Sequence, residues 1–421
     1  MGVVAQLRSK TENRLGRSDR SAAGRWFWEI DRVLLFFVAV LIAIGLIAVA
    51  AASPAASQRL SGGGLSYAPL YHFYRQLVWI IVAVPVMIAV SMLPRTKAKR
   101  WCLIGSLIFT GLLFLVPIIG VEVNGARRWL GIGFTQFQPS EFLKPLYIVS
   151  IAWMLSLKEQ DASLPVVPLS GICTGLIALL LMQQPNFGET IIFAAAWVML
   201  LTLSGASLRM LGLLGVAGLV GIVLAYFFYP VATTRIDAFL FAGAEHDTYQ
   251  TESALRTLTA GGLFGAGHDT YQTESALRTL TAGGLFGVGP GAGSLKFHLP
   301  EPHTDYIFSV IGEEFGIIAC LAIAAIYLVI VARVLIRLLH EEDKFVVLAA
   351  AGLVCQFGLQ ALINMAVNVQ IAPSKGMTLP FISYGGSSMV ALSIGMGLLL
   401  AFTRRNPYLH RSPYVVKWSG R

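Results

Sequence analysis

Charged residues are scarce in this sequence, and that scarcity excludes an ordinary soluble domain. Only 13% of the 421 residues are Asp, Glu, Lys or Arg, 56% are hydrophobic, and the mean hydropathy is +0.71. Soluble domains carry about a quarter charged residues. The composition therefore predicts a membrane protein with many spans, so that no domain count follows from its length.

Cysteine is also scarce, and no secretory leader is apparent. The four cysteines lie in or beside apolar runs without a CxxC pair, so neither a disulfide framework nor a zinc site is indicated. A polar stretch of about thirty residues precedes the first apolar run, which argues against a cleavable signal peptide. The net charge of +9 comes from basic residues at the termini and in short loops, a placement that favours lipid headgroups over nucleic acid.

The apolar runs predict an all-α polytopic fold with ten transmembrane helices. Lys and Arg gather before the first span, after the second, after the eighth and after the last, so the positive-inside rule puts both termini in the cytoplasm. We expect basic cytoplasmic tails over 1–30 and 406–421, a transmembrane unit over 31–405, and a large outer segment over about 231–305 between helices seven and eight. The predicted spans lie near 33–53, 77–94, 101–120, 141–157, 166–182, 189–204, 208–230, 306–335, 344–370 and 384–403.

The outer segment contains a tandem duplication. HDTYQTESALRTLTAGGLFG occurs at 246–265 and again at 268–287. Two copies are too few for a solenoid, so a local duplication in a tolerant outer loop is the simpler interpretation. We predict that the second copy keeps the working packing and the first bulges out, with the opposite assignment left open.

The segment LPEPHTDYIF places three titratable residues directly before an apolar run. They are Glu301, His303 and Asp305. Charge at a membrane boundary is costly unless it faces water, a partner or a substrate, so Asp305 is a candidate acid or base. The alternative is that these residues only end a helix in the headgroup zone.

Two other outer segments carry cations. Arg127 and Arg128 lie in NGARRWLGIG, and paired guanidinium groups suit the phosphate of a lipid headgroup, although Arg beside Trp also serves as a plain interfacial anchor. Glu141 and Lys144 open the fourth span, where we expect an i,i+3 ion pair of structural character and a helix cap from Ser140.

The segment PSKGMTLPFISYGGSS, at 373–388, is rich in glycine and hydroxyl groups and carries Lys375. Irregular backbone at this depth requires burial in protein or a wet cavity, and glycine lets N–H groups approach a phosphate. A re-entrant loop without ligand is the alternative. Glu313 and Glu314, inside the eighth span, are expected either to function directly or to orient Asp305.

These motifs together resemble the SEDS (FtsW/RodA) family, named for shape, elongation, division and sporulation. The resemblance rests on LPEPHTDYIFSVIGEEFG, PSKGMTLPFISYGGSS, NGARRWL with QPSEFLK, and YQTESALRTLTAGGLFGVGPG, in the family's order over about 30–405. The form KGMTLPFISYGGSS and the basic tails are closer to the division members than to the elongation members.

The resemblance implies a peptidoglycan glycosyltransferase that joins lipid II units outside the cell membrane during division. It places the essential aspartate at Asp305 and the loop lysine at Lys375, and it allows help from a divalent cation such as Mg or Mn, without a certain metal ligand. It further implies a class B penicillin-binding transpeptidase and other division proteins as partners, no nucleic acid, and a septal location in the bacterial inner membrane. The residues implied in substrate binding are Arg127, Arg128, Glu301, His303, Lys375, Ser383, Gly385 and Ser387, supported by Glu141, Lys144 and Glu314.

Two features depart from the family pattern, and two rival functions stay open. Asn186 stands where the family usually has aspartate, and the duplication is additional. A lipid II flippase would need a polar path and broken helices around a midplane site. A non-catalytic division scaffold would tolerate loss of charge at Asp305 and Lys375.

Overall fold

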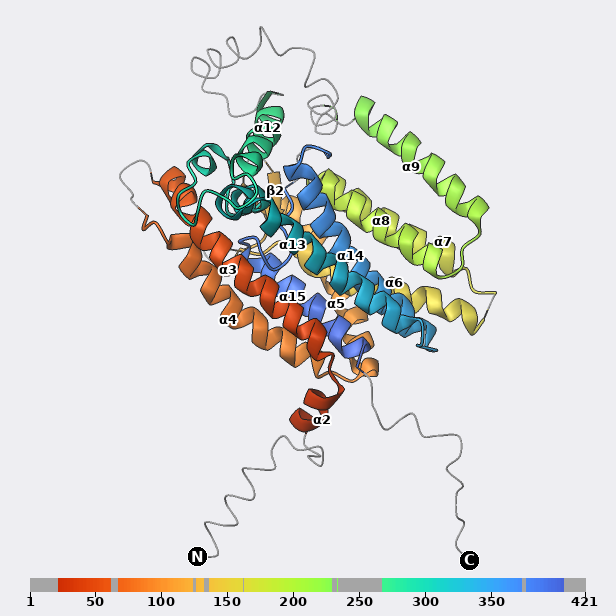
Figure 1. The fold of residues 1–421 in the computed structure, drawn as a ribbon. Coiled ribbons are helices and arrows are strands. Elements are labelled where there is room, and N and C mark those ends of the chain that lie inside the picture. Colours follow the sequence, from red (N-terminus) through yellow and green to blue (C-terminus); the bar gives the residue numbers. More distant parts are fainter. Residues whose placement is uncertain are drawn as a thin grey trace, which may run out of the picture.

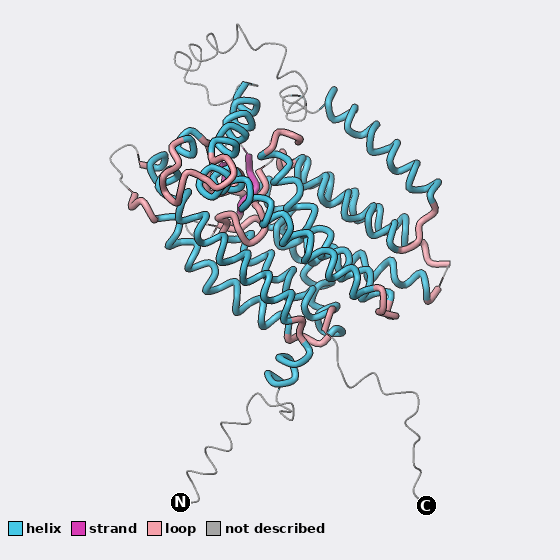
Figure 2. Tube along the Cα trace, in the orientation of Figure 1, coloured by secondary structure: helices cyan, strands magenta, loops and turns pink. Residues whose placement is uncertain are grey.

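The structure, a computed structural model, describes residues 22–61, 67–123, 126–131, 136–161, 163–228, 233, 267–372 and 376–404. Long helices lie side by side in one bundle, with loops and short elements at its two ends (Figures 1 and 2). The bundle helices are α3 (Arg32–Leu60), α4 (Tyr71–Ser91), α5 (Arg95–Ile119), α6 (Pro139–Ser156), α7 (Val166–Gln183), α8 (Phe187–Leu203), α9 (Leu208–Phe228), α13 (Ile307–Leu338), α14 (Lys344–Asn368) and α15 (Gly386–Phe402).

Each predicted span coincides with one of these helices. Seven described helices are long and apolar enough to cross a membrane, namely α3, α4, α5, α7, α9, α13 and α14, while α8 and α15 are apolar but shorter. The largest shift of a boundary is at α3, which ends at Leu60 rather than near residue 53. α4 begins at Tyr71 rather than near residue 77. His72 and Gln76 are buried in its first turns, so hydropathy alone places the start too late.

The core lies between α3, α6, α13, α14 and α15. More than half of the best apolar window of α14 is buried, whereas α9 has no buried residue and stands beside α8 at the edge (Figure 1). A polytopic protein buries its central helices in protein and exposes apolar outer helices to lipid. The exposed apolar surface of α4, α5 and α9 has that character.

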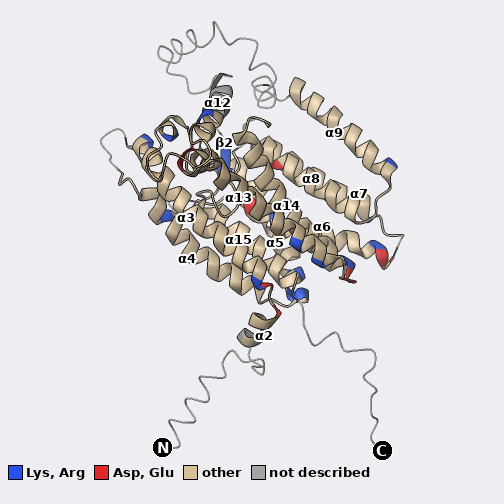
Figure 3. Cartoon of the chain, viewed as in Figure 1, with Lys and Arg blue, Asp and Glu red and all other residues tan. Residues whose placement is uncertain are grey.

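One end of the bundle is held by ion pairs between segments far apart in the sequence. Asp31 caps α3 by accepting hydrogen bonds from the backbone N–H groups of residues 33 and 34, and its carboxylate pairs with Arg333 at 3.0 Å and with Arg337. Arg95 pairs with Glu341 at 3.4 Å, at the turn between α13 and α14. Figure 3 shows basic residues at this end and a bundle wall with few charges.

A short helix, α2 (Ala22–Glu29), precedes α3 at the same end and lies in the stretch that was predicted only as a basic tail. Trp26 donates its Nε1–H to Ser91 Oγ at 2.8 Å, and Glu29 lies 4.0 Å from Arg404 after α15. The segments flanking the first and last bundle helices therefore meet at one end of the molecule.

The opposite end carries the elaborate segments. β1 (Val121–Val123) and β2 (Ala126–Trp129) form an antiparallel hairpin. α12 (Gly267–Ala282) and the 3-10 turn η3 (Leu295–His298) lead toward α13. A second 3-10 turn, η2 (Leu157–Glu159), directly follows the last residue of α6. The second repeat copy forms α12, which packs against α13. The first copy, 246–265, lies outside the described residues, so the choice between the copies stays a prediction.

α13 is broken at Gly316, and the lead-in loop 283–289 fills the break. Gly316 has φ of 81°, so the helix hydrogen bonds across it are lost. The carbonyls of Glu313 and Glu314 accept instead from Val288 N and Gly289 N at 2.9 and 3.1 Å. Ile317 N and Ile318 N donate in return to residues 284 and 285 at 3.0 and 3.3 Å. The orphaned groups of a broken helix are thus satisfied by another part of the chain, as a membrane interior requires.

The two glutamate side chains hold the next part of the same loop. Glu313 accepts from Leu295 N at 2.7 Å and Lys296 N at 3.0 Å, while Glu314 pairs with Lys296 Nζ and accepts from Gly291 N. Glu314 and Lys296 are both almost fully buried. Both glutamates therefore fix the loop that leads to Asp305, which agrees with the expectation that they orient it.

The glycine-rich segment before α15 is a re-entrant loop. Its residues 380–382 reach the middle of α3, where a side chain at Gly45 would lie 2.5 Å from Phe381 O. Tyr327 Oη donates to Pro380 O at 2.6 Å, and Gln76 Nε2 donates to Ser383 O at 3.3 Å. Side chains of the bundle thus satisfy the carbonyls of this irregular backbone, which is the condition for tolerating it at depth.

Candidate active site

Two hydrogen bonds join residues 303–305 (His-Thr-Asp, the HTD segment) to the re-entrant loop. Tyr384 N donates to His303 O at 2.8 Å, and Ser383 Oγ donates to Thr304 O at 2.7 Å while accepting from Leu379 N. Ser383 is almost fully buried. Its hydroxyl therefore fixes the position of the two motifs relative to each other. The substrate contact that the resemblance implies for Ser383 stays a prediction.

The third carbonyl of the segment, that of Asp305, is held from α14. Asn364 and Asn368 donate their Nδ2–H groups to Asp305 O at 2.9 and 3.1 Å. Asn364 also donates to Met377 O at 2.7 Å, and Asn368 Oδ1 accepts from Ser309 N and Oγ at 3.1 and 2.7 Å. Successive carbonyls from 303 to 305 are all occupied, so the backbone that carries Asp305 has one fixed position.

The carboxyl group of Asp305 borders the loop that carries the predicted lysine. A Cβ added to Gly376 would lie 3.4 Å from Asp305 Oδ2. Asp305 is half-buried, which leaves part of it open at the end of the bundle. Lys375 precedes Gly376 but lies outside the described residues, so its role stays a prediction.

His303 lies in an aromatic cluster behind the segment. Its ring centroid is 4.0 Å from that of His72 and 5.2 Å from that of Tyr384, and Glu301 Oε2 is 3.8 Å from its Nδ1. Burial, with the nearby His72 and Arg75, lowers the pKa of His303 to about 3. His303 is therefore neutral at physiological pH in this structure, and its binding role stays a prediction.

The two arginines of the hairpin differ in their surroundings. Arg128 donates from Nε to Gln184 O at 3.2 Å and from its terminal nitrogen to Pro185 O, so it caps the end of α7. Arg127 is half-exposed and lies 3.4 Å from the exposed Glu122 across the hairpin. Of the two, only Arg127 presents its guanidinium toward open surface.

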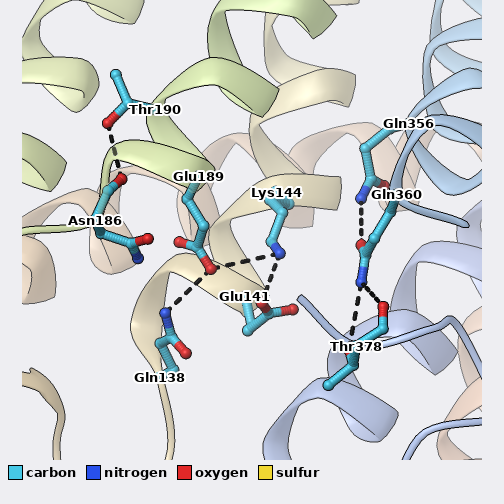
Figure 4. Close-up of polar contacts among 9 residues, drawn as sticks. All are labelled: Gln138, Glu141, Lys144, Asn186, Glu189, Thr190, Gln356, Gln360 and Thr378. Carbon is cyan, nitrogen blue, oxygen red and sulfur yellow. Dashed lines mark hydrogen bonds and ion pairs between the residues drawn. The ribbon is translucent and has the colours of Figure 1, made fainter. Parts of the chain in front are cut away.

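A second polar cluster lies at the start of α6 (Figure 4). Lys144 Nζ is 2.6 Å from Glu141 Oε1, which confirms the predicted i,i+3 pair, and 3.5 Å from Glu189 Oε1 on α8. Gln138 Nε2 donates to the same Glu189 oxygen at 3.1 Å. The cluster is buried, so both carboxylates compensate one desolvated ammonium group.

The expected cap by Ser140 is wrong. α6 begins at Pro139 with Gln138 as its N-cap residue and without a side-chain cap. Proline is favoured at the first helical position because its φ is already helical, and this moves Ser140 into the first turn. Its hydroxyl is buried there, and no hydrogen-bond partner is found for it within the described residues.

A small pocket lies between α6, α14 and α15, next to this cluster. Gln356 donates to Gln360 at 3.1 Å, and Gln360 donates to Thr378 O at 3.1 Å (Figure 4). The pocket wall thereby reaches the loop beside Asp305. The lining residues are Glu141, Lys144, Pro145, Leu353, Gln356, Phe357, Gln360, Ala391, Leu392, Gly395, Met396 and Leu399.

Packing explains the paired glycines that end the re-entrant loop. A side chain at Gly385 would clash with Ser388 Oγ, and one at Gly386 would lie 2.5 Å from the ring of Trp79. Ser387, in the first turn of α15, is buried. The binding role of Gly385 and Ser387 stays a prediction.

The divalent cation that the resemblance allows stays a prediction. No three His, Cys, Asp or Glu side chains gather as ligands among the described residues. Magnesium sites in nucleotide enzymes often need only one or two carboxylates with substrate phosphates. A missing cluster of three ligands therefore does not test this prediction.

Comparisons with known proteins place the chain in a family. The family model described as "Cell cycle protein", FtsW/RodA/SpoVE, matches residues 31–270 and 268–408. The chain belongs to the FtsW/RodA/SpoVE family. The two matched stretches overlap where the second repeat copy begins, which agrees with one copy being additional to the family pattern.

Curated relatives cover almost the whole chain. A probable peptidoglycan glycosyltransferase FtsW of Caulobacter vibrioides is 35% identical over 402 residues, covering 95% of this chain and 96% of the relative. A protein of the same name from Coxiella burnetii is 32% identical, covering 90% and 98%. The family resemblance inferred from the motifs is thereby confirmed.

Solved structures of the family share the fold. A chain of a peptidoglycan synthase complex that coordinates polymerization and crosslinking is 25% identical, with a TM-score of 0.67, covering 89% of this chain and 97% of that one. RodA of Thermus thermophilus, a rod shape determining protein, is also 25% identical, with a TM-score of 0.61 and coverage of 89% and 96%.

Several residues that contact the family motifs from other parts of the chain were not predicted from the sequence. Asn364 and Asn368 lie one turn apart inside an apolar helix, and this spacing on one face is a signal that could have been used. Glu189 gave a weaker signal as a lone carboxylate at the start of α8. Lys296 gave none, because its partner is known only from the fold.

Proposed function

We propose that this protein is a peptidoglycan glycosyltransferase that polymerises lipid II during bacterial cell division and releases undecaprenyl pyrophosphate. Family membership and the names of relatives that match over nearly their full length support the activity. The single structural observation that carries it is the half-buried Asp305, whose backbone is clamped to the glycine-rich loop at the end of the bundle.

Asp305 acts as general base in the proposed step. Its carboxylate takes the proton from the acceptor 4-hydroxyl as that oxygen attacks C1 of the donor sugar. The new C1–O4 bond forms while the bond from C1 to the pyrophosphate oxygen breaks, and the pyrophosphate leaves with its lipid. The energy comes from the activated donor, so no ATP is needed outside the cell.

Cations near the leaving group stabilise its developing charge. Lys375 and Arg127 are our candidates, Lys375 from its place beside Gly376 and Arg127 from its half-exposed guanidinium. Arg128 contributes by holding the hairpin to the end of α7. Glu301, which is half-exposed beside Asp305, lies where it can contact a sugar or peptide of the substrate.

The proposed orientation is ten spans with both termini in the cytoplasm. The ion-paired end with Arg95, Arg333 and Arg404 is then cytoplasmic, as the positive-inside rule requires. The end with Asp305 faces outward in the inner membrane, at the division septum. The fold likeness to a chain of a peptidoglycan synthase complex supports a penicillin-binding transpeptidase as partner.

Reconstitution in liposomes tests the activity against the rival flippase. The purified protein, with and without a class B penicillin-binding protein, receives labelled lipid II. We expect the label to appear in lengthening glycan strands. Movement of the labelled headgroup across the bilayer without any strand growth would contradict the proposal and favour transport.

A further inference from the structure

Asn364 touches both motifs of the proposed site with one amide group. Its Nδ2 donates to Asp305 O at 2.9 Å and to Met377 O at 2.7 Å, across 59 and 13 residues of sequence. Asn364 is 2% exposed and lies on α14, a well-buried helix of the core. The two hydrogens of one side chain thus connect the backbone of the proposed base with the loop that carries Lys375.

We propose that Asn364 is a positioning residue of the transfer site, which fixes Asp305 relative to the re-entrant loop. The inference rests on the proposed glycosyl transfer and adds a residue to it. Asn364 acts through the backbone of both segments, so it is not itself a catalytic residue.

The NH₂ group of the amide satisfies both contacts. The two groups that it meets are carbonyl oxygens, which accept and never donate, so the amide must present its NH₂ group to both of them. The network therefore determines the orientation of the amide, without the usual ambiguity of nitrogen and oxygen. A carboxylate in the same place would set a negative oxygen against two carbonyl oxygens.

Asn368 reinforces the arrangement from one turn further along. It donates to Asp305 O at 3.1 Å and to Asn364 O at 2.8 Å, and its own oxygen accepts from Ser309 at the start of α13. It makes no bond to the re-entrant loop among the described contacts. Asn368 thus ties Asp305 to α13 and α14, and Asn364 adds the link to the loop.

This link matters for catalysis because the base and the cation must meet one substrate. Displacing a catalytic group by about 1 Å can cost on the order of 100-fold in rate. The Asp305 carboxyl group already borders Gly376, so a small shift of the loop changes the distance between the base and this loop directly.

The variant Asn364→Asp, in the full-length protein, tests the inference through pH. At high pH the introduced carboxylate has no hydrogen to donate, and at low pH its protonated form donates one. We therefore expect the kcat of the variant to be about 100-fold below that of the wild type at high pH. The difference between the two is expected to shrink as pH falls. The wild-type rate itself falls in that direction, because its base becomes protonated.

Gln184→Glu is the matched control. Gln184 is 1% exposed, and its Nε2 donates to Leu113 O at 3.0 Å, away from Asp305. The same exchange of amide for carboxyl is expected to lower the unfolding midpoint but to give a ratio of rates that does not change with pH. A pH-independent ratio for Asn364→Asp, or a ratio near one, overturns the inference.

A second variant keeps the test valid if Asn364→Asp does not fold. Asn364→Ser retains one donor, and we expect kcat to fall about 10-fold with KM within about two-fold of the wild type. A change in KM alone, or none in either, overturns the positioning role. The wild type in the same assay separates the two hypotheses. If the wild type itself forms no glycan, the proposed function is wrong, whatever the role of Asn364.

Discussion

Lys296 and Glu314 form a buried ion pair that holds the approach to Asp305. Their side chains are 1% and 0% exposed, and Glu314 also accepts from Gly291 N. Two desolvated charges compensate each other only while both are present. Removing either one leaves a buried charge without its partner.

The variant Lys296→Met is expected to lose about 3–5 kcal/mol of stability. The double variant Lys296→Met with Glu314→Gln is expected to recover most of that loss, because the remaining amide oxygen still accepts from Gly291 N. Thermal unfolding of the purified protein in detergent measures both. Arg127→Met, which removes a half-exposed ion pair, is the control and should change little.

Among single residues, the sequence predicted what lies within one turn. Glu141 and Lys144 are three residues apart, so helix geometry alone brings them together at 2.6 Å. Asn364 and Lys296 act on partners that are neighbours only in the folded chain, and nothing local indicates those partners. Asp305 was found because a carboxylate at an apolar boundary is unusual whatever its partners.

At the scale of the helices, the break in α13 determines where the preceding loop packs. The helix is kinked at Gly316, and loop 283–289 supplies the missing hydrogen bonds. Gly287 is required there for space as well as for its φ of 82°, since a Cβ would clash with Glu314 O. Hydropathy showed one continuous span. The hydrogen-bonding groups at the break are satisfied by another segment, so the apolar run in the sequence is not interrupted there.

Gly287→Ala should therefore destabilise the protein strongly and lower its activity. Gly284→Ala is the matched control in the same loop, with a positive φ of 61° but nothing within 4 Å of its Cβ. The control carries only the backbone strain, on the order of 1 kcal/mol. Equal unfolding midpoints for the two variants would show that the loop does not pack into the break.

Deleting residues 246–266 removes the first repeat copy and leaves α12 and its loop in place. We expect normal abundance and a polymerisation rate within about two-fold of the full chain, because a surface loop tolerates a change in length at small cost. Loss of activity on this deletion, with the protein still folded, would mean that the first copy contributes to polymerisation.

The whole molecule has two chemically different ends. One is closed by Asp31 with Arg333 and Arg337, and the other carries Asp305 and the loops around it. The alternation of apolar spans and the positions of Lys and Arg predicted this polarity. They did not predict that α9 stands at the edge, because its apolar sequence suits lipid and protein equally.

Cysteine labelling in intact cells tests this polarity. Glu301→Cys, at a half-exposed site, should react with a membrane-impermeant thiol reagent added outside. Glu342→Cys, exposed between α13 and α14, should react only after the membrane is permeabilised. The reverse pattern would place Asp305 in the cytoplasm. The wild type, with its four native cysteines, gives the background.

The role of Asp305 as the base is decided by the polymerisation rate of Asp305→Asn beside the wild type, with the transpeptidase present and the two proteins at equal abundance. The substitution keeps the size of the side chain and removes its basicity. We predict a loss of about 10²–10⁴-fold in glycan synthesis with an unchanged unfolding midpoint. Glycan strands formed at the wild-type rate by Asp305→Asn would show that this carboxylate is not the base.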